Sequence, residues 1–316
     1  MALHIETPYI ESRPLSLGTG KSVWLKLEAL QPTGSFKARG MGHACLIHKQ
    51  HGAQRFISSS GGNAGLAVAY AGRQLKVPVT VVVPESTSER AKALIAMEKG
   101  VVVVHGKNWG EAHQAAKAMV DAHSVLLHPF DDPLLWSGHS TMIDEMVRQG
   151  PRPDAIILSV GGGGLLCGVI EGLQKSSWGG VPVVAVETVG ADCLAQSLQA
   201  GEPVTLDDIT TVATSLGARR ACDRALDLSR SHSVESVVVQ DRQAVEACVR
   251  FMDDHRLIVE PACGASLAAL FSNADSLRRA TTIAVVVCGG VGSTAANLAA
   301  LHERLAESAD TTATPS

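Results

Sequence analysis

Short runs of β-branched residues alternate along this chain with longer stretches that have the periodicity of amphipathic helices. This alternation is typical of βα units on a largely parallel, buried sheet, so we expect an α/β protein. The predicted strands are residues 23–27, 55–59, 79–83, 101–104, 155–160, 181–187, 234–239 and 281–287. The predicted helices are residues 38–48, 65–75, 88–99, 109–123, 134–149, 164–174, 241–255, 265–272 and 293–307.

The chain has 316 residues, of which 46% are hydrophobic and only 18% are charged, which is enough for two domains with substantial cores. An acidic turn with two prolines at residues 129–133 marks a boundary. We expect a small domain at residues 38–130 and a large domain made of residues 1–37 and 131–316. A ligand would then bind in the cleft between them, at the carboxyl ends of strands.

The net charge is −4 and no long basic block occurs, so neither nucleic acid nor an anionic membrane is an expected partner. No apolar run reaches membrane-spanning length, and the polar start does not resemble a signal peptide. The seven cysteines are widely spaced, without a Cys-x-x-Cys pair, which indicates free thiols in a reducing compartment. We therefore expect a cytoplasmic protein.

Lys37 follows a Pro/Gly turn, has Phe36 beside it and precedes the predicted helix 38–48. A lysine held at a turn against apolar surface can lose its proton and act as an amine nucleophile. Schiff-base chemistry with a carbonyl cofactor requires such an amine. A surface or structural role for this lysine stays open at this point.

The first glycine-rich loop joins a predicted strand to a predicted helix and reads Ser58-Ser59-Ser60-Gly61-Gly62-Asn63-Ala64-Gly65. Its glycines allow a ligand to approach the backbone closely, and the helix that follows presents unpaired N–H groups that favour an anion. Ser60 and Asn63 add hydrogen-bonding side chains. We interpret the loop as a site for a carboxylate or a phosphate, with a glycine turn used only for packing as the alternative.

The second loop contains four consecutive glycines between the predicted strand 155–160 and the predicted helix 164–174. Glycines are entropically unfavourable to order, so a plain connection would rarely use four of them. We interpret the loop as a backbone cradle for a phosphate. It is not a Walker loop, because no Gly-Lys-Ser/Thr follows, and it fits a dinucleotide-binding fingerprint poorly.

A third candidate lies at the end of the last predicted strand, where Cys288 precedes Gly289 and Gly290. From a strand end the thiol would point toward the same cleft. The alternative is that Cys288 is a small buried hydrophobe.

In this order the motifs resemble the fold type II (tryptophan synthase β-like) pyridoxal-phosphate enzymes, and more closely their L-serine dehydratase / serine dehydratase-like branch. The resemblance runs from about residue 32 to residue 292. It implies two domains, each a mostly parallel twisted sheet flanked by helices, and a homodimer. The matching stretches are Gly34-Ser35-Phe36-Lys37, Ser59-Ser60-Gly61-Gly62-Asn63-Ala64-Gly65, Pro129-Phe130-Asp131-Asp132-Pro133, Ser159-Val160-Gly161-Gly162-Gly163-Gly164-Leu165-Leu166, Glu187-Thr188, Val259-Glu260-Pro261-Ala262-Cys263-Gly264-Ala265 and Val287-Cys288-Gly289-Gly290.

The resemblance also implies roles for individual residues. Lys37 would bind pyridoxal phosphate as a Schiff base and act as the general base, while Phe36 packs against the ring. Asn63 would hydrogen-bond the ring 3-hydroxyl, and Cys288 would face the ring nitrogen. The phosphate would be held by Gly161, Gly162, Gly163, Gly164 and Leu165. The carboxylate of an amino-acid substrate would be held by Ser60, Gly61, Gly62, Asn63 and Ala64.

Position 61 separates neighbouring activities within the resemblance. Racemases and β-replacement enzymes of this fold have Ser or Thr there, whereas Gly61 cannot supply a proton. Elimination is therefore expected over racemisation. Gly61 also departs from the alanine of the most active dehydratases, which leaves the turnover and the preference between serine and threonine open.

Glu187 ends a predicted strand, where it is either a phosphate-proximal or ion-binding residue or a plain strand-end carboxylate. Cys193 stands where racemase-like sites need an aspartate, so the resemblance favours a monovalent cation, K⁺, bound by carbonyls of Gly161, Ala191 and Leu216. Glu260, directly before a helix start, is interpreted as a capping or structural residue.

The expected activity is dehydration and deamination of L-serine to pyruvate and ammonia, with L-threonine giving 2-oxobutanoate as a secondary reaction. A threonine dehydratase and a weakly active cofactor-binding homologue are the alternatives. Gly61 argues against a serine racemase and against a β-replacement transferase. A non-enzymatic dinucleotide-binding module is the simplest interpretation of the predicted fold alone.

Overall fold

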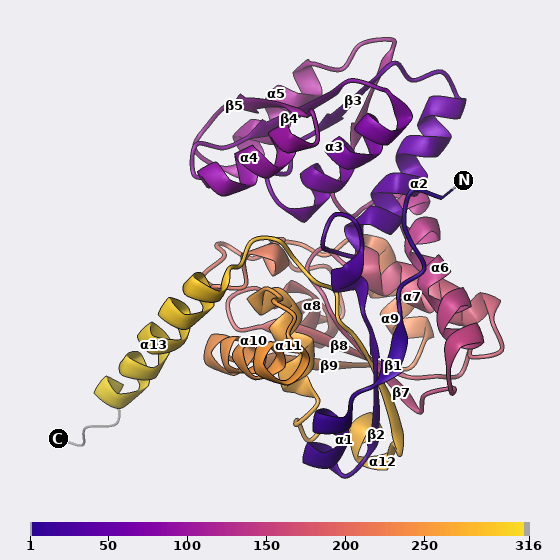
Figure 1. Ribbon diagram of the computed structural model, residues 1–316, viewed down its shortest axis with the longest axis vertical. Coiled ribbons are helices and arrows are strands. Elements are labelled where there is room, and N and C mark those ends of the chain that lie inside the picture. Colours follow the sequence, from indigo (N-terminus) through magenta and orange to yellow (C-terminus); the bar gives the residue numbers. More distant parts are fainter. Residues whose placement is uncertain (1, 313–316) are drawn as a thin grey trace.

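The strands of the computed structural model form two separate sheets within residues 2–312, the part of the chain that the structure describes. Figure 1 shows the smaller sheet with its helices as one unit and the larger sheet with its helices as a second unit beside it. The expected α/β class is confirmed.

The larger sheet has the strand order β1-β2-β10-β7-β8-β9. All its neighbouring strands are parallel except β1 and β2, which are antiparallel. Its central strands are apolar on both faces, as expected for a sheet that helices cover on both sides. The bounds are β1 Tyr9–Glu11, β2 Ser22–Lys26, β7 Ala155–Ser159, β8 Val183–Thr188, β9 Val234–Val239 and β10 Thr282–Val286.

The smaller sheet is entirely parallel and has the order β5-β4-β3-β6. Its bounds are β3 Arg55–Ser58, β4 Val79–Val83, β5 Val101–Val104 and β6 Ser124–Leu127.

The helices mostly follow strands, as βα units require, and α13 extends away from the rest of the larger unit (Figure 1). No helix among residues 2–312 is both long enough and apolar enough to cross a membrane. The bounds are α1 Arg13–Thr19, α2 Lys37–Gln50, α3 Asn63–Leu75, α4 Glu89–Met97, α5 Trp109–Ala118, α6 Pro133–Gln149, α7 Gly164–Lys175, α8 Cys193–Ala200, α9 Asp223–Ser231, α10 Asp241–His255, α11 Pro261–Ala269, α12 Asp275–Arg279 and α13 Ala295–Thr312, with short 3₁₀ turns η1 Glu28–Leu30 and η2 Thr214–Leu216.

Every predicted strand is present, with ends within two residues of the prediction. The predictions missed β1 and β6, which are only three and four residues long. The predicted helix 109–123 was too long, because α5 ends at Ala118 and the chain turns into β6. The predicted helix 265–272 begins earlier, at Pro261, whose ring suits the first turn of a helix.

A buried ionic cluster fixes the start of α2. Arg39 donates to Glu28 at 2.7 Å and to Glu145 of α6 at 2.6 Å, and Lys26 of β2 donates to Glu145 at 2.6 Å. Charges withdrawn from water in this way must stay paired, because an unpaired buried ion is strongly destabilising. The cluster therefore holds the first turn of α2, and Lys37 within it, against β2 and α6.

Candidate active site

Lys37 is the first residue of α2, and its Nζ donates a hydrogen bond to the backbone oxygen of Pro129 at 2.5 Å. The residue is half-buried. Burial lowers the pKa of Lys37 from 10.5 to about 8, while Cys288 and Glu260 nearby act in the opposite direction. A lowered pKa is what an amine nucleophile requires, so the role predicted for Lys37 stays a prediction that its surroundings favour.

The Cys288 loop lies directly against the segment that precedes Lys37. The N–H of Phe36 donates to the oxygen of Cys288 at 3.1 Å, and Ser35 forms an isolated β-bridge with Gly289. Gly289 has φ +86°, and a Cβ placed on it would lie 2.3 Å from the oxygen of Gly34. Only glycine permits this close approach, which brings Cys288 beside Lys37.

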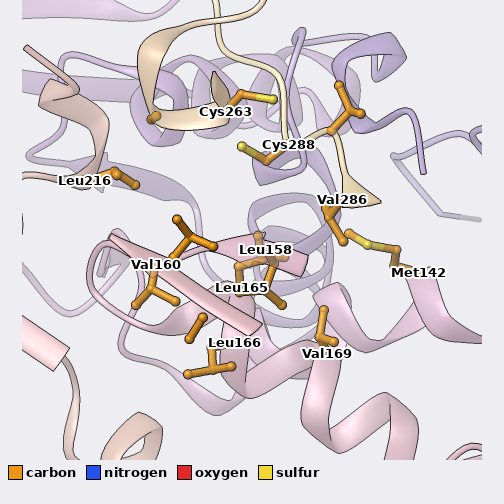
Figure 2. Close-up of a cluster of buried hydrophobic side chains, with 14 of the residues drawn as sticks. Met142, Leu158, Val160, Leu165, Leu166, Val169, Leu216, Cys263, Val286 and Cys288 are labelled. Carbon is orange, nitrogen blue, oxygen red and sulfur yellow. The ribbon is translucent and has the colours of Figure 1, made fainter. Parts of the chain in front are cut away.

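Cys288 is a buried thiol next to Cys263 of α11 (Figure 2). The hydrogen bond with Cys263, followed by burial, raises the pKa of the Cys288 thiol well above its usual range. The thiol is therefore neutral at physiological pH and can face a ring nitrogen without supplying a negative charge.

The tetraglycine loop connects β7 to α7. Gly163 precedes α7 with φ +90°, and no side chain caps the helix. A Cβ on Gly162 would lie 2.2 Å from Cγ of Phe130, and one on Gly164 would lie 2.5 Å from the oxygen of Phe130. The loop thus packs on Phe130. The residue before it, Pro129, accepts the hydrogen bond from Lys37.

This geometry fits a phosphate-bearing aldehyde. The start of α7 offers backbone N–H groups and the positive end of the helix dipole, which favour an anion. A reactive amine stands next to it, linked through Pro129 and Phe130. The residues present therefore suit pyridoxal phosphate.

The first glycine-rich loop ends at Asn63, where α3 begins without a side-chain cap. A Cβ on Gly65 would lie 1.8 Å from the oxygen of Ser60, so the loop folds back tightly on its own helix. Asn63 reaches across to the larger unit: its Nδ2 donates to Glu260 Oε1 at 2.8 Å, and its Oδ1 accepts from the Val291 N–H at 3.1 Å. The structure therefore brings this loop to the site of Lys37.

Gly61 and Phe36 have specific neighbours. A Cβ on Gly61 would lie 2.7 Å from Cγ2 of Thr87 and 3.2 Å from Cγ1 of Val83, so a larger residue would displace Thr87. The ring of Phe36 packs against His139, with the ring centroids 5.0 Å apart.

Glu187 is fully buried and accepts hydrogen bonds from the N–H groups of Leu194 at 2.9 Å and Ala195 at 2.7 Å. Burial raises the pKa of Glu187 to about 7, although these two bonds oppose the shift. Both carboxylate oxygens are thus engaged by the first turn of α8.

Two of the three residues predicted to bind a cation lie near each other. A Cβ on Gly161 would lie 3.3 Å from the oxygen of Leu216, and Cys193 Sγ lies 3.9 Å from the oxygen of Gly161. Ala191, the third residue, lies close to Cys193 in the sequence and forms an isolated β-bridge with Thr188. Within residues 2–312 no group of three or more His, Cys, Asp or Glu side chains could hold a metal ion.

Sequence reasoning missed several residues of the site. Phe130 belongs to the acidic turn, which was interpreted as a domain boundary and as a matching stretch but was given no role in the site. Thr87, and Ser215 near Glu260, carry no local signal. Glu260 was interpreted as a capping or structural residue, yet it makes no side-chain cap on α11 and instead contacts Asn63. The Glu-Pro pair at a helix start was the available signal for Glu260, but the direction of the Glu260 side chain cannot be predicted from the sequence.

Known proteins resemble the chain over nearly its whole length. It is 45% identical over 314 residues to the human protein named L-serine dehydratase/L-threonine deaminase, covering 96% of each chain. It is 44% identical to human serine dehydratase-like, covering 96% of this chain and 95% of that protein. The structure of an L-serine ammonia-lyase from the fungus Rhizomucor miehei superposes with a TM-score of 0.90 at 36% identity, covering 96% of this chain and 99% of that one. Residues 2–289 match the family described as pyridoxal-phosphate dependent enzyme, and the chain belongs to that family.

Proposed function

We propose that this protein is a pyridoxal-phosphate-dependent ammonia-lyase that converts L-serine to pyruvate and ammonia, with L-threonine giving 2-oxobutanoate as a secondary reaction. One observation carries the proposal: Lys37, an amine of lowered pKa, lies where three loops meet, two of them at uncapped helix N-termini. The named activities of the relatives, L-serine dehydratase, L-threonine deaminase and L-serine ammonia-lyase, support it.

The resemblance to fold type II enzymes implies which residues would hold the cofactor, and their positions around Lys37 support those roles. Lys37 would bind it covalently, Asn63 would reach the ring 3-hydroxyl, Cys288 would face the ring nitrogen, and Phe36 would pack against the ring. The phosphate would lie at the start of α7, held by the backbone of Gly161, Gly162, Gly163, Gly164 and Leu165. When bound, the cofactor withdraws electrons from Cα of an amino acid and thereby acidifies the Cα proton.

The chain's own groups would then direct the reaction. The N–H groups at the start of α3, in the loop 60–64, hold the substrate carboxylate and fix the orientation of Cα. Lys37, with its pKa lowered to about 8, is available as a neutral amine that accepts the Cα proton. The neutral Cys288 thiol leaves the ring nitrogen without a negative partner. Gly61 offers no second proton donor at Cα, so elimination is favoured over racemisation.

The direct test is the formation of pyruvate from L-serine by the cofactor-loaded protein. We expect pyruvate, a visible absorbance band, and borohydride trapping of the cofactor on Lys37; Lys37→Ala should lose all three, with activity reduced by at least about 10⁴-fold. A protein that traps cofactor on Lys37 but forms no pyruvate would be a cofactor-binding homologue and would contradict the lyase proposal.

The names of the relatives include both serine and threonine. We propose L-serine as the main substrate and keep threonine dehydratase as the second candidate. Comparing kcat/KM for L-serine, L-threonine and D-serine separates them: a larger value for L-threonine would reverse the assignment. A large rate on D-serine would indicate a different active-site geometry.

We further propose that K⁺ binds near the carbonyls of Gly161, Ala191 and Leu216. The proximity of Gly161 to Leu216 supports this, because hard cations prefer oxygen ligands. Glu187 would lie near these groups without ligating the cation, since its oxygens are bonded to α8. Activity should fall when K⁺ is exchanged for a large organic cation. Equal activity in both media would contradict the proposal.

Two statements about organisation are proposals of the same kind. We propose that residues 38–130 form the small domain and that residues 1–37 and 131–316 form the large one, supported by the separate sheets. We also propose a cytoplasmic homodimer. Limited proteolysis tests the boundary near residue 130, and light scattering tests the dimer. Seven buried free cysteines support a reducing compartment.

A further inference from the structure

Glu260 lies close to three segments, which contain Asn63, Ser215 and Gly292. Its side chain accepts a hydrogen bond from Asn63 Nδ2 at 2.8 Å, and Ser215 and the backbone N–H of Gly292 lie close enough to lower the pKa of the carboxyl group. The residue is 7% exposed, and Lys37 lies close enough to interact with it electrostatically. A Cβ on Gly290 would lie 2.0 Å from Cδ of Glu260, so the chain needs glycine there to admit this carboxyl group.

The side chain of Glu260 does not cap its own helix. It precedes Pro261 at the start of α11, but its side chain makes no capping hydrogen bond. Proline also has no N–H to offer at that position. The carboxyl group is instead directed to the small-domain loop, which indicates that it acts on the site.

The contacts of Asn63 fix the direction of its amide. Its Oδ1 must face the N–H of Val291, and its Nδ2 must face an oxygen of Glu260. A side-chain amide has two N–H donors on Nδ2. With one of them given to Glu260, the second remains free for another acceptor.

We propose that Glu260 is a positioning residue for the cofactor, because it orients Asn63 so that the free N–H of Nδ2 is presented to the ring oxygen. This inference rests on the proposed binding of pyridoxal phosphate at Lys37. Glu260 does not touch the cofactor in this proposal; it acts through Asn63.

The role depends on a carboxylate. Asn63 donates to Glu260, and the donors of Ser215 and Gly292 lie close by; a carboxylate can accept from all of them, whereas a glutamine would turn an NH₂ group toward at least one donor. Burial raises the pKa of Glu260, while the bonds from Ser215, Asn63 and Gly292 and the charge of Lys37 act to lower it. Glu260→Gln therefore removes an acceptor with almost no change of size.

The test is the affinity of the apo-protein for pyridoxal phosphate, measured by fluorescence titration, with Glu260→Gln, Asn63→Ala and the double variant. We expect each single variant to weaken binding about tenfold, as for the loss of one buried hydrogen bond. Because Glu260 acts through Asn63, the double variant should bind no more weakly than Asn63→Ala alone. Effects that multiply in the double variant, or an unchanged affinity of Glu260→Gln, would overturn the proposal.

A matched control lies at the opposite end of the larger sheet. Glu235 of β9 also accepts two hydrogen bonds, from the N–H groups of Asp275 at 2.6 Å and Ser276 at 2.9 Å. Glu235→Gln makes the same chemical change away from the site and should leave the affinity for pyridoxal phosphate unchanged. An equal loss of affinity in Glu235→Gln would assign the effect of Glu260→Gln to general destabilisation and overturn the proposal.

A second pair of variants separates a loss of affinity from a loss of folding. Asn63→Asp sets a carboxylate against Glu260, so the Tm of the apo-protein should fall. Adding Glu260→Gln restores a donor and an acceptor and should recover the Tm. The affinity should stay low, because the aspartate has no N–H for the ring oxygen. Recovery of both the Tm and the affinity would overturn the proposal.

The outcomes separate this inference from the proposed function. If the wild-type protein bound no pyridoxal phosphate, the proposed function would fail as well. If the wild-type protein bound it and Glu260→Gln left the affinity unchanged, only this inference would fail.

Discussion

The two uncapped glycine-rich loops near Lys37 differ most clearly at the glycines just before their helices. A Cβ on Gly162 of the tetraglycine loop would lie 2.2 Å from Phe130, and one on Gly163 would lie 2.4 Å from Cβ of Ala225. On Gly62 of the other loop, a Cβ would meet nothing within 4 Å. The tetraglycine loop is thus set by its packing, whereas the other loop has free space on one side.

The hydrogen bonds of the loops differ in the same direction. The oxygen of Gly162 accepts from the N–H of Cys222, in another segment of the larger unit, at 3.0 Å. The other loop reaches that unit through the side chain of Asn63. A preformed cradle suits a cofactor that stays bound, and a loop with space suits a substrate that enters and leaves.

The titration of Lys37, next to both loops, has the largest expected effect. Its pKa near 8 means that the unfolded chain, with a lysine pKa near 10.5, binds more protons between these two values. The stability of the apo-protein should therefore rise with pH across that window. At neutral pH the Lys37 amine should react about 100-fold faster with an amine reagent than an ordinary lysine does.

The measurement is the pH dependence of labelling at Lys37 in the apo-protein, followed by peptide mass spectrometry. Exposed Lys107 provides an internal reference in the same sample. A midpoint above pH 10 for Lys37 would show that the space between the loops is open to water and would remove the lysine's predicted advantage as a base.

Gly162→Ala tests the enclosed loop directly. The added methyl group would collide with the Phe130 ring, and overpacking of this kind costs about 1–3 kcal/mol. We expect the affinity for pyridoxal phosphate to fall about 100-fold, because the cradle and the neighbouring Pro129 must both move. A titration of apo-protein with the cofactor measures this. Phe130→Ala combined with Gly162→Ala should recover part of the loss, and no recovery would contradict the steric explanation.

The enclosed loop was more predictable from the sequence than the open one. Four glycines between a predicted strand and a predicted helix indicated an anion cradle, and β7 and α7 lie where they were predicted. Asn63 was identified, but its bonds to Glu260 and Val291 join residues about 200 positions apart. Local patterns carry no information on such contacts. For the same reason the position of Thr87 beside Gly61 could not be predicted, whereas β6 was missed because it is only four residues long.

Gly61→Ser tests the partly enclosed position of the open loop and has a smaller expected effect. The hydroxyl would supply a second acid/base at Cα, so D-serine formed relative to pyruvate should rise several-fold. The added Cβ must displace Thr87, which should lower the Tm by a few degrees. Chiral chromatography and a pyruvate assay give the ratio. Gly61→Ala carries the same Cβ without the hydroxyl and should leave the ratio unchanged; an unchanged ratio in Gly61→Ser would contradict the role assigned to position 61.

Gly62→Ala has the smallest expected effect and makes the comparison decisive. It adds the same methyl group as Gly162→Ala, at the residue just before an uncapped helix, but into open space. We expect less than about a twofold change in affinity for pyridoxal phosphate and a stability within about 0.5 kcal/mol of the wild type. Only the KM for L-serine should respond, because the methyl group would lie on the loop that we propose binds the carboxylate. If Gly62→Ala weakened cofactor binding as strongly as Gly162→Ala, the two loops would share the work of holding the cofactor, and the separation into a fixed cradle and an adaptable substrate loop would be wrong.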